Sequence, residues 1–129
     1  MRPGRVARAL PALLWAGGIL LLSSMPDPPG GRLADVPHLD KVAHAGLFGV
    51  LAALLRLARL PPAWAVAVAG AWGVLDEALQ ARIPGRDPSA GDVFADLAGA
   101  VLAVMVVRWL AARGRGAGYR GDRNGGPTS

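Results

Sequence analysis

Residues 42–60 read VAHAGLFGVLAALLRLARL and residues 63–79 read AWAVAVAGAWGVLDEAL, and only Pro61 and Pro62 separate these two runs. Neither run shows the alternation of apolar and polar residues that is typical of a half-buried strand. Each is about as long as a helix must be to cross the hydrocarbon core of a bilayer, roughly 17 to 25 residues. The two prolines make a tight reversal, so the stretch predicts a pair of antiparallel membrane helices.

Two further apolar runs complete the pattern, at residues 9–24 and 92–110, and the first of these is the shortest of the four. Proline and glycine interrupt the chain between runs, at residues 26–31 and 84–88. A backbone in lipid must satisfy its own hydrogen bonds, so all four runs are predicted to be helices. We expect an all-α polytopic integral membrane protein, with a bundle of four transmembrane helices formed by residues 1–113.

Composition also favours a membrane protein over a small soluble domain. Of the 129 residues, 53% are hydrophobic and 18% are charged, and the mean hydropathy is +0.36. The chain has no cysteine, which excludes disulfides, a thiolate nucleophile and a cysteine-ligated metal. The net charge is +5, but the arginines do not form a basic face interleaved with stacking aromatic residues. The sequence therefore argues against nucleic-acid binding.

Charge orients the predicted bundle, because basic residues concentrate on the cytoplasmic side of membrane proteins. Most basic residues fall on one side of the bundle: Arg2, Arg5, Arg8, Arg56, Arg59, Arg108, Arg113, Arg115, Arg120 and Arg123. Most acidic residues fall on the other side: Asp27, Asp35, Asp40, Asp76, Glu77, Asp87, Asp92 and Asp96. We expect a multi-pass protein of the cell membrane with both termini in the cytoplasm and the acidic side extracytoplasmic.

The two ends of the chain carry separate predictions. An arginine-rich start, an apolar core and two serines also fit a cleaved signal peptide in the first run. No clear small-x-small cleavage site precedes Met25, and cleavage would leave the remaining helices in the same orientation. The basic, glycine-rich segment at residues 114–129 has no apolar periodicity and is predicted to be disordered.

Polar residues, which are costly in lipid, recur at the predicted outer end of successive helices. Asp40 and His44 lie four residues apart on one face of the second helix, where the carboxylate can orient or charge the imidazole. His44 is then a candidate general acid or base. In the alternative, Asp40 caps the helix and His44 only forms hydrogen bonds within the bundle.

Asp76 and Glu77 are adjacent carboxylates at the end of the third helix, followed by Gln80, where the helix dipole disfavours negative charge. They call for a compensating positive group, for which the chain offers Arg82, Arg86, Lys41, a protonated His44 or a divalent cation bound by oxygen ligands. The Arg86 guanidinium can form a bidentate interaction with a phosphate or carboxylate, or it can form a salt bridge to Asp76 or Glu77.

Asp92 and Asp96 lie one turn apart at the start of the fourth helix. Ser89 followed by Asp92 matches a helix-start signature and predicts a helix beginning near Ala90. Asp96 should lie deeper in the membrane, so it must be paired, protonated or functional. Gly99 continues this face, with Ala103 beyond it, and such small residues let a neighbouring helix approach closely.

The order of these motifs resembles that of the VanZ-like membrane proteins, a family named for a protein associated with teicoplanin resistance. The motifs run from the first helix through the fourth: Ser23-Ser24-x-Pro26, Asp40-Lys41-x-x-His44 with Phe48, Asp76-Glu77-x-x-Gln80, Pro84-Gly85-Arg86-x-x-Ser89-x-x-Asp92 and Asp96-x-x-Gly99. The family pattern has asparagine where this chain has Asp96, and glycine where it has Ala103. Whether position 96 acts here as an amide-like hydrogen-bonding group or as a carboxylate is left open.

The resemblance implies an effect on the cell envelope, including glycopeptide susceptibility, and no defined reaction. We expect an outward-facing polar pocket that acts on or binds an anionic lipid or a lipid-linked envelope precursor, with a divalent cation as a candidate cofactor. The candidate catalytic residues are His44, Asp40, Asp76 and Glu77, and the candidate substrate-binding residues are Lys41, Gln80, Arg86, Asp92 and Asp96. The alternative is a non-catalytic membrane protein that alters envelope properties or antibiotic access through binding or partners. A transporter is disfavoured because one small bundle leaves little room for alternating access.

Overall fold

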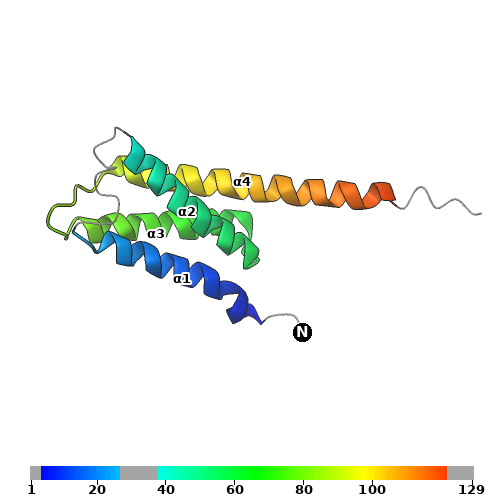
Figure 1. Ribbon diagram of the computed structural model, residues 1–129, viewed down its shortest axis with the longest axis horizontal. Coiled ribbons are helices and arrows are strands. Elements are labelled where there is room, and N and C mark those ends of the chain that lie inside the picture. The colour runs from blue at the N-terminus through cyan, green and yellow to red at the C-terminus, as the bar shows by residue number, and fades with distance from the viewer. Residues whose placement is uncertain (1–3, 27–37, 122–129) are drawn as a thin grey trace, which may run out of the picture.

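The computed structural model describes residues 4–26 and 38–121, and in this part of the chain the regular secondary structure is all helix, with no strand. The helices are α1 (Arg5–Ser23), α2 (Leu39–Leu57), α3 (Pro62–Gln80) and α4 (Ala90–Gly121). They alternate in direction, so the ends of α1 and α3 lie beside the starts of α2 and α4 (Figure 1). The predicted all-α fold is confirmed for the described residues.

The helix ends differ from the predicted ones, because the prediction located apolar runs and a backbone helix can continue past them. α2 begins at Leu39, which places Asp40 and Lys41 in its first turn. α4 continues to Gly121 instead of ending near residue 110, so the first residues of the tail predicted to be disordered are helical. No proline interrupts residues 111–121. Several charges used in the topology prediction lie outside the described residues: Arg2, Asp27, Asp35 and Arg123. The end of the tail, residues 122–129, also lies outside them.

The reversal between α2 and α3 is closed by the backbone of the arginine that precedes the two prolines. Arg59 adopts a left-handed conformation with φ of 73°. Its N–H donates to the Arg56 carbonyl at 2.9 Å, and the Leu60 N–H donates to the Leu55 carbonyl at 3.0 Å. These two bonds form a Schellman motif, which satisfies carbonyls at the helix end. The motif explains why α2 ends at Leu57, before the apolar run does.

The most extensive helix contact joins α2 and α4, and glycine makes it possible. A Cβ atom added to Gly99 would overlap the backbone of Ala45 on α2. A Cβ atom on Gly49 would lie 3.1 Å from the Gly99 carbonyl oxygen and 3.7 Å from the Ala103 side chain. The expectation that small residues at positions 99 and 103 allow a close approach is therefore confirmed.

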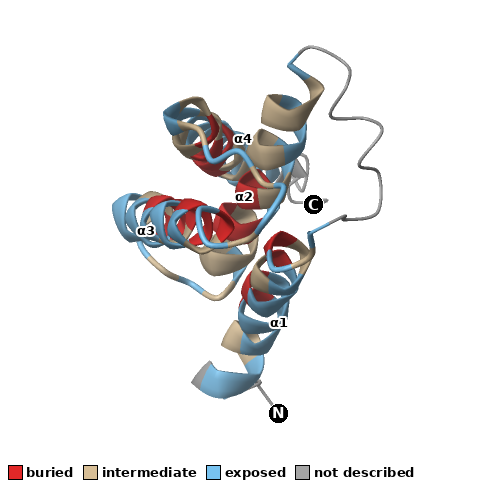
Figure 2. Ribbon diagram, turned by 90° about the vertical axis from the view of Figure 1, so that its left-hand side faces the viewer, coloured by how far each residue is buried: buried red, intermediate tan, exposed pale blue. Residues whose placement is uncertain are grey.

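The buried residues are few and lie mostly where the helices face one another (Figure 2). Many large apolar side chains are exposed. The core contains Ala12, Ala16, Ile19, Phe48, Leu51, Ala52, Ala65, Ala69, Ala100 and Val104. The exposed set includes Leu14, Leu21, Phe94, Leu102 and Met105. Two of the described helices are long and apolar enough to cross a membrane, α1 over Val6–Ser23 and α4 over Ala90–Arg115.

Arginines gather at the end of the bundle opposite the starts of α2 and α4. Arg8 from α1 lies beside Arg59, where the two line one surface depression. Arg56 from α2 lines another depression with Arg108 and Arg115 from α4. We call this the arginine end and the opposite one the carboxylate end. The charge separation seen in the sequence is thus also a separation in space within the described residues.

Candidate functional site

Every buried polar or charged side chain of the described residues lies at the carboxylate end. This buried polar cluster consists of Ser23, Asp76, Glu77, Gln80, Asp92 and Asp96. The antiparallel order of the helices brings these residues together from α1, α3 and α4, and Lys41 and His44 join them from the start of α2. The sequence identified all of these positions as site residues except Ser23, whose only signal was its place in the motif order.

His44 is held by a carboxylate from another helix. Its Nδ1 lies 3.0 Å from Oδ1 of Asp96, which is fully buried. Phe48, one turn further along α2, keeps its ring nearly parallel to the imidazole, with 6.2 Å between centroids. Of the two interpretations of this pair, the structure shows His44 forming its hydrogen bond within the bundle, while Asp40 neither bonds to His44 nor caps α2. The close approach of α2 and α4 at Gly99 brings Asp96 within hydrogen-bond reach, and Asp40 pairs with Lys41.

Asp96 also makes tight contact with α3. A Cβ atom added to Gly73 would lie 2.5 Å from Asp96 Oδ2, so the absence of a side chain there makes room for the carboxylate. Oδ2 is buried and has no hydrogen-bond partner among the described residues. Asp96 is therefore paired through one oxygen and unsatisfied at the other, at the point where three helices meet.

Lys41 bridges two carboxylates at the partly exposed edge of the cluster. Its Nζ lies 3.0 Å from Asp40 Oδ2 and 3.0 Å from Asp92 Oδ1. Both Asp40 and Lys41 precede the apolar run that begins at Val42. The hydrogen bond from Lys41 holds the pKa of Asp40 below its ordinary value, and the bonds to Asp40 and Asp92 raise the pKa of Lys41. This end of α2 therefore carries a fixed ammonium at neutral pH.

Glu77, which belongs to α3, stabilises the start of α4 through a hydrogen bond. Its Oε2 accepts the backbone N–H of Ser89 at 2.9 Å, and the Ser89 hydroxyl accepts the Gly91 N–H at 3.1 Å. The prediction of a helix starting near Ala90 is confirmed. In a capping box the carboxylate three residues on would take the Ser89 N–H. Here Glu77 of α3 takes it, which leaves Asp92 free to pair with Lys41.

A second group of hydrogen bonds ties α3 to α1. Gln80 Nε2 donates to Asp76 Oδ2 at 2.9 Å and to the Ser23 hydroxyl at 3.4 Å. Asp76 Oδ1 and Glu77 Oε1 are buried and have no hydrogen-bond partner among the described residues. No lysine, arginine or histidine in the described part of the chain forms an ion pair with either carboxylate. Their predicted need for a compensating positive group is thus not met by a protein side chain.

Arg86 takes a different partner from the ones expected. Its Nη2 donates to the Leu22 carbonyl at 3.1 Å, and its buried Nε has no partner among the described residues. The predicted salt bridge to Asp76 or Glu77 is not formed. The preceding Gly85 has φ of 84°, a conformation that glycine adopts without strain. The turn thereby directs Arg86 toward the end of α1, where it joins the α3–α4 loop to that helix.

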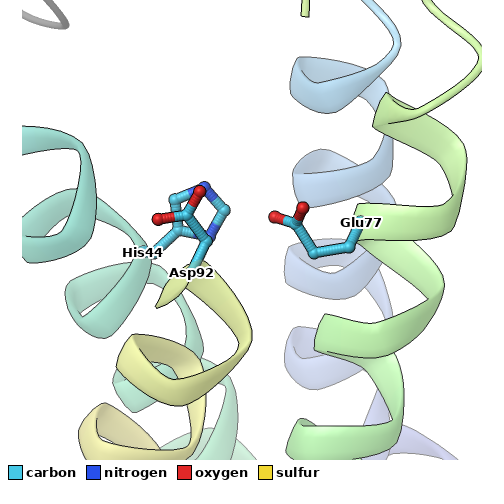
Figure 3. Close-up of side chains that lie close together, drawn as sticks. All are labelled: His44, Glu77 and Asp92. Carbon is cyan, nitrogen blue, oxygen red and sulfur yellow. The ribbon is translucent and has the colours of Figure 1, made fainter. Parts of the chain in front are cut away.

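Three of the side chains are arranged in a way that can hold a metal ion. His44, Glu77 and Asp92 each place a potential ligand atom within 4.8 Å of the other two. Figure 3 shows the Glu77 carboxylate directed from α3 toward Asp92 and His44.

Comparisons with protein-family models, with curated proteins and with solved structures find no match to this chain.

The geometry at Asp96 yields a prediction about this side chain. Asp96→Asn keeps an oxygen that accepts a hydrogen bond from His44 and removes a buried charge, so its stability should stay within about 1 kcal/mol of the original protein. Asp96→Ala loses that acceptor and should cost about 1–3 kcal/mol. Thermal unfolding of the three proteins in one detergent measures the difference. Equal destabilisation by both variants would contradict the assignment of Asp96 as the acceptor for His44.

Proposed function

We propose that this chain is a VanZ-like integral membrane protein whose polar pocket binds or acts on an anionic lipid or a lipid-linked envelope precursor. The observation that carries the proposal is the buried polar cluster at one end of a bundle with an apolar exterior. Such a molecule presents apolar surface to lipid tails and concentrated polar chemistry at the level of the headgroups. A substrate with a polar head and an apolar tail fits both features.

A membrane setting is supported by the exposed surface of the two candidate spans. Only 22% of each span is buried, whereas the core helix of a soluble protein would be mostly buried. Large exposed apolar residues are unfavourable in water and favourable in lipid. The proposal includes all four helices as spans, with the polar residues of α2 and α3 shielded by packing. It also places the arginine end and both termini in the cytoplasm, in agreement with the positive-inside rule.

Two tryptophans support α1 as a permanent part of the bundle. Trp15 of α1 donates its indole N–H to the Leu47 carbonyl of α2 at 2.9 Å. Trp72 of α3 donates to the Ala16 carbonyl of α1 at 3.1 Å. A leader peptide has no need of such fitted contacts. They favour retention of the first apolar segment over its removal as a signal peptide.

An apolar groove between α1 and α2 offers a place for the tail of the substrate. It has a volume of about 540 Å³ and is lined by Pro11, Leu14, Trp15, Gly18, Ile19, Leu22, Leu47 and Leu54. Leu22 lines the groove, and its carbonyl accepts the hydrogen bond from Arg86. The groove therefore reaches the edge of the buried polar cluster. A lipid lying in it would bring its headgroup toward the Arg86 guanidinium, a strong ligand for phosphate.

The side chains suit a reaction at such a headgroup. The Nδ1 of His44 is engaged by Asp96, so its Nε2 is left either to transfer a proton or to bind a cation that in turn binds the headgroup. Lys41 and Arg86 supply positive charge that can stabilise a phosphate oxygen. A non-catalytic membrane protein is the second candidate. It is favoured by the structural hydrogen bonds of Glu77 to Ser89 and of Gln80 to Asp76, which hold the bundle together without any substrate.

The two histidines of the chain allow a matched test of catalysis. His44→Asn keeps a donor near the Nδ1 position for Asp96 and removes Nε2, so it should abolish turnover without unfolding the bundle. His38→Asn is the control, because His38 is exposed and asparagine tolerates its left-handed φ of 66°. Lipids and envelope precursors are profiled in cells expressing equal amounts of each protein. If the original protein changes the lipid profile and the His44→Asn variant changes it to the same extent, the enzymatic form of the proposal is contradicted.

Two adjacent glycines allow a matched test of the groove. A side chain added at either Gly17 or Gly18 meets open space, but only Gly18 lines the groove. Gly18→Leu should therefore weaken binding of a fluorescent phosphatidylglycerol to the purified protein by about tenfold or more, since it occupies the volume of the tail. Gly17→Leu should leave binding unchanged. Equal affinities of the two variants would exclude the groove as the site of the lipid tail.

A further inference from the structure

We propose that His44, Glu77 and Asp92 bind a divalent first-row transition-metal cation, such as Zn²⁺ or Mn²⁺, where α2, α3 and α4 meet. The inference rests on the proposed function, because it assigns a cation to the same pocket and gives the substrate phosphate a partner there. One potential ligand atom from each residue lies within 4.8 Å of the others. The three ligands come from three helices, so the cation would also connect those helices.

The charge balance of the pocket favours a bound cation. Asp76, Glu77, Asp92 and Asp96 are all buried. Among the described residues, the only basic side chains paired with this set are Lys41, which bonds to Asp92, and His44, which bonds to Asp96. Buried carboxylates must be paired, metal-bound or protonated, because an isolated charge is strongly disfavoured away from water. A divalent cation bound by Glu77 and Asp92 supplies two positive charges beside Glu77, which lacks a basic partner.

Glu77 is an oriented ligand with one oxygen free. Its exposure is 8%, and its Oε2 is fixed by the Ser89 backbone N–H at 2.9 Å. Its Oε1 is completely enclosed and has no hydrogen-bond partner among the described residues. The carboxylate points toward Asp92 and His44 in Figure 3. A carboxylate that is directed toward two other ligand groups, with one oxygen that no donor of the described residues satisfies, is suited to a metal ion.

His44 has the surroundings of a metal-binding histidine. Its Nδ1 is engaged by Asp96 Oδ1 at 3.0 Å, which leaves the lone pair of Nε2 for a metal. Metal-bound histidines commonly donate their other nitrogen to a carboxylate in this way. Asp96 is thus a positioning residue, and the buried contact with Gly73 fixes it in turn.

The ligand types select the class of metal. One imidazole nitrogen and two carboxylate oxygens suit Zn²⁺ or Mn²⁺, whereas Mg²⁺ and Ca²⁺ prefer oxygen ligands alone. Ligand bonds of about 2.1 Å place tetrahedral ligands about 3.4 Å apart, so modest side-chain rotations close the site from its present spacing. Three protein ligands leave a coordination position for water or a phosphate oxygen. Asp92 can bind the metal while Lys41 remains on its Oδ1.

Metal binding to the full-length protein in detergent tests the proposal. Chelator-treated protein is dialysed against Zn²⁺ or Mn²⁺, and the bound metal is measured by mass spectrometry and by the electron paramagnetic resonance of Mn²⁺. We expect about one ion per chain, with affinity reduced at least about tenfold in Glu77→Gln and in His44→Asn. Asp87→Asn is the matched control, because Asp87 is an exposed carboxylate in the α3–α4 loop. It should bind as the original protein does.

Two results would overturn the inference: no stoichiometric ion on the original protein, or an equal loss in the Asp87→Asn control. If Glu77→Gln does not fold, ¹⁵N-histidine labelling of the original protein replaces it, since a histidine ligand gives nitrogen coupling to Mn²⁺ and its absence excludes one. Binding of fluorescent phosphatidylglycerol is measured with and without metal. Lipid binding without any stoichiometric metal overturns the cation site and leaves the proposed function standing. Stoichiometric metal without lipid binding supports the cation site and counts against the proposed function.

Discussion

The burial of Asp96 is the constraint on which the rest of the structure depends. This carboxylate is fully buried, with one oxygen on His44 and the other against Gly73. It fits only because α2 and α4 approach closely at Gly99 and because α3 has no side chain at Gly73. A charge in that position is costly without a partner, so the packing of α2, α3 and α4 and the hydrogen bond between His44 and Asp96 depend on each other. Changes that loosen the helix contacts would therefore also disturb the proposed site.

The other polar contacts extend this arrangement to the whole carboxylate end. Glu77 satisfies the Ser89 N–H at the start of α4, and Arg86 holds the α3–α4 loop to the end of α1. Each contact fixes a side chain by one atom and leaves another atom without a partner among the described residues, as at Glu77 Oε1 and Arg86 Nε. Structural hydrogen bonds explain the first set of atoms. A bound cation and an anionic substrate are our explanation for the second set.

Local patterns in the sequence were sufficient for the helices and for most members of the cluster. Apolar runs and proline breaks are local signals, and a buried polar residue in an apolar run is conspicuous by its cost. The end of α2 was missed because it depends on the left-handed conformation of Arg59. The partners were missed for a different reason. Whether His44 meets Asp40 or Asp96 depends on how α2 and α4 are rotated against each other, and that rotation is fixed by contacts distant in the sequence.

The central claim is that the carboxylate end of a membrane-spanning bundle faces outward, and cysteine labelling tests it most directly. The chain has no cysteine, so each introduced thiol reports only its own position. In intact cells, a membrane-impermeant maleimide should label Asp87→Cys in the α3–α4 loop, while Ala112→Cys at the arginine end should react only after permeabilisation. Labelling of Ala112→Cys with protection of Asp87→Cys would reverse the topology, and recovery of the protein outside the membrane fraction would contradict the account altogether.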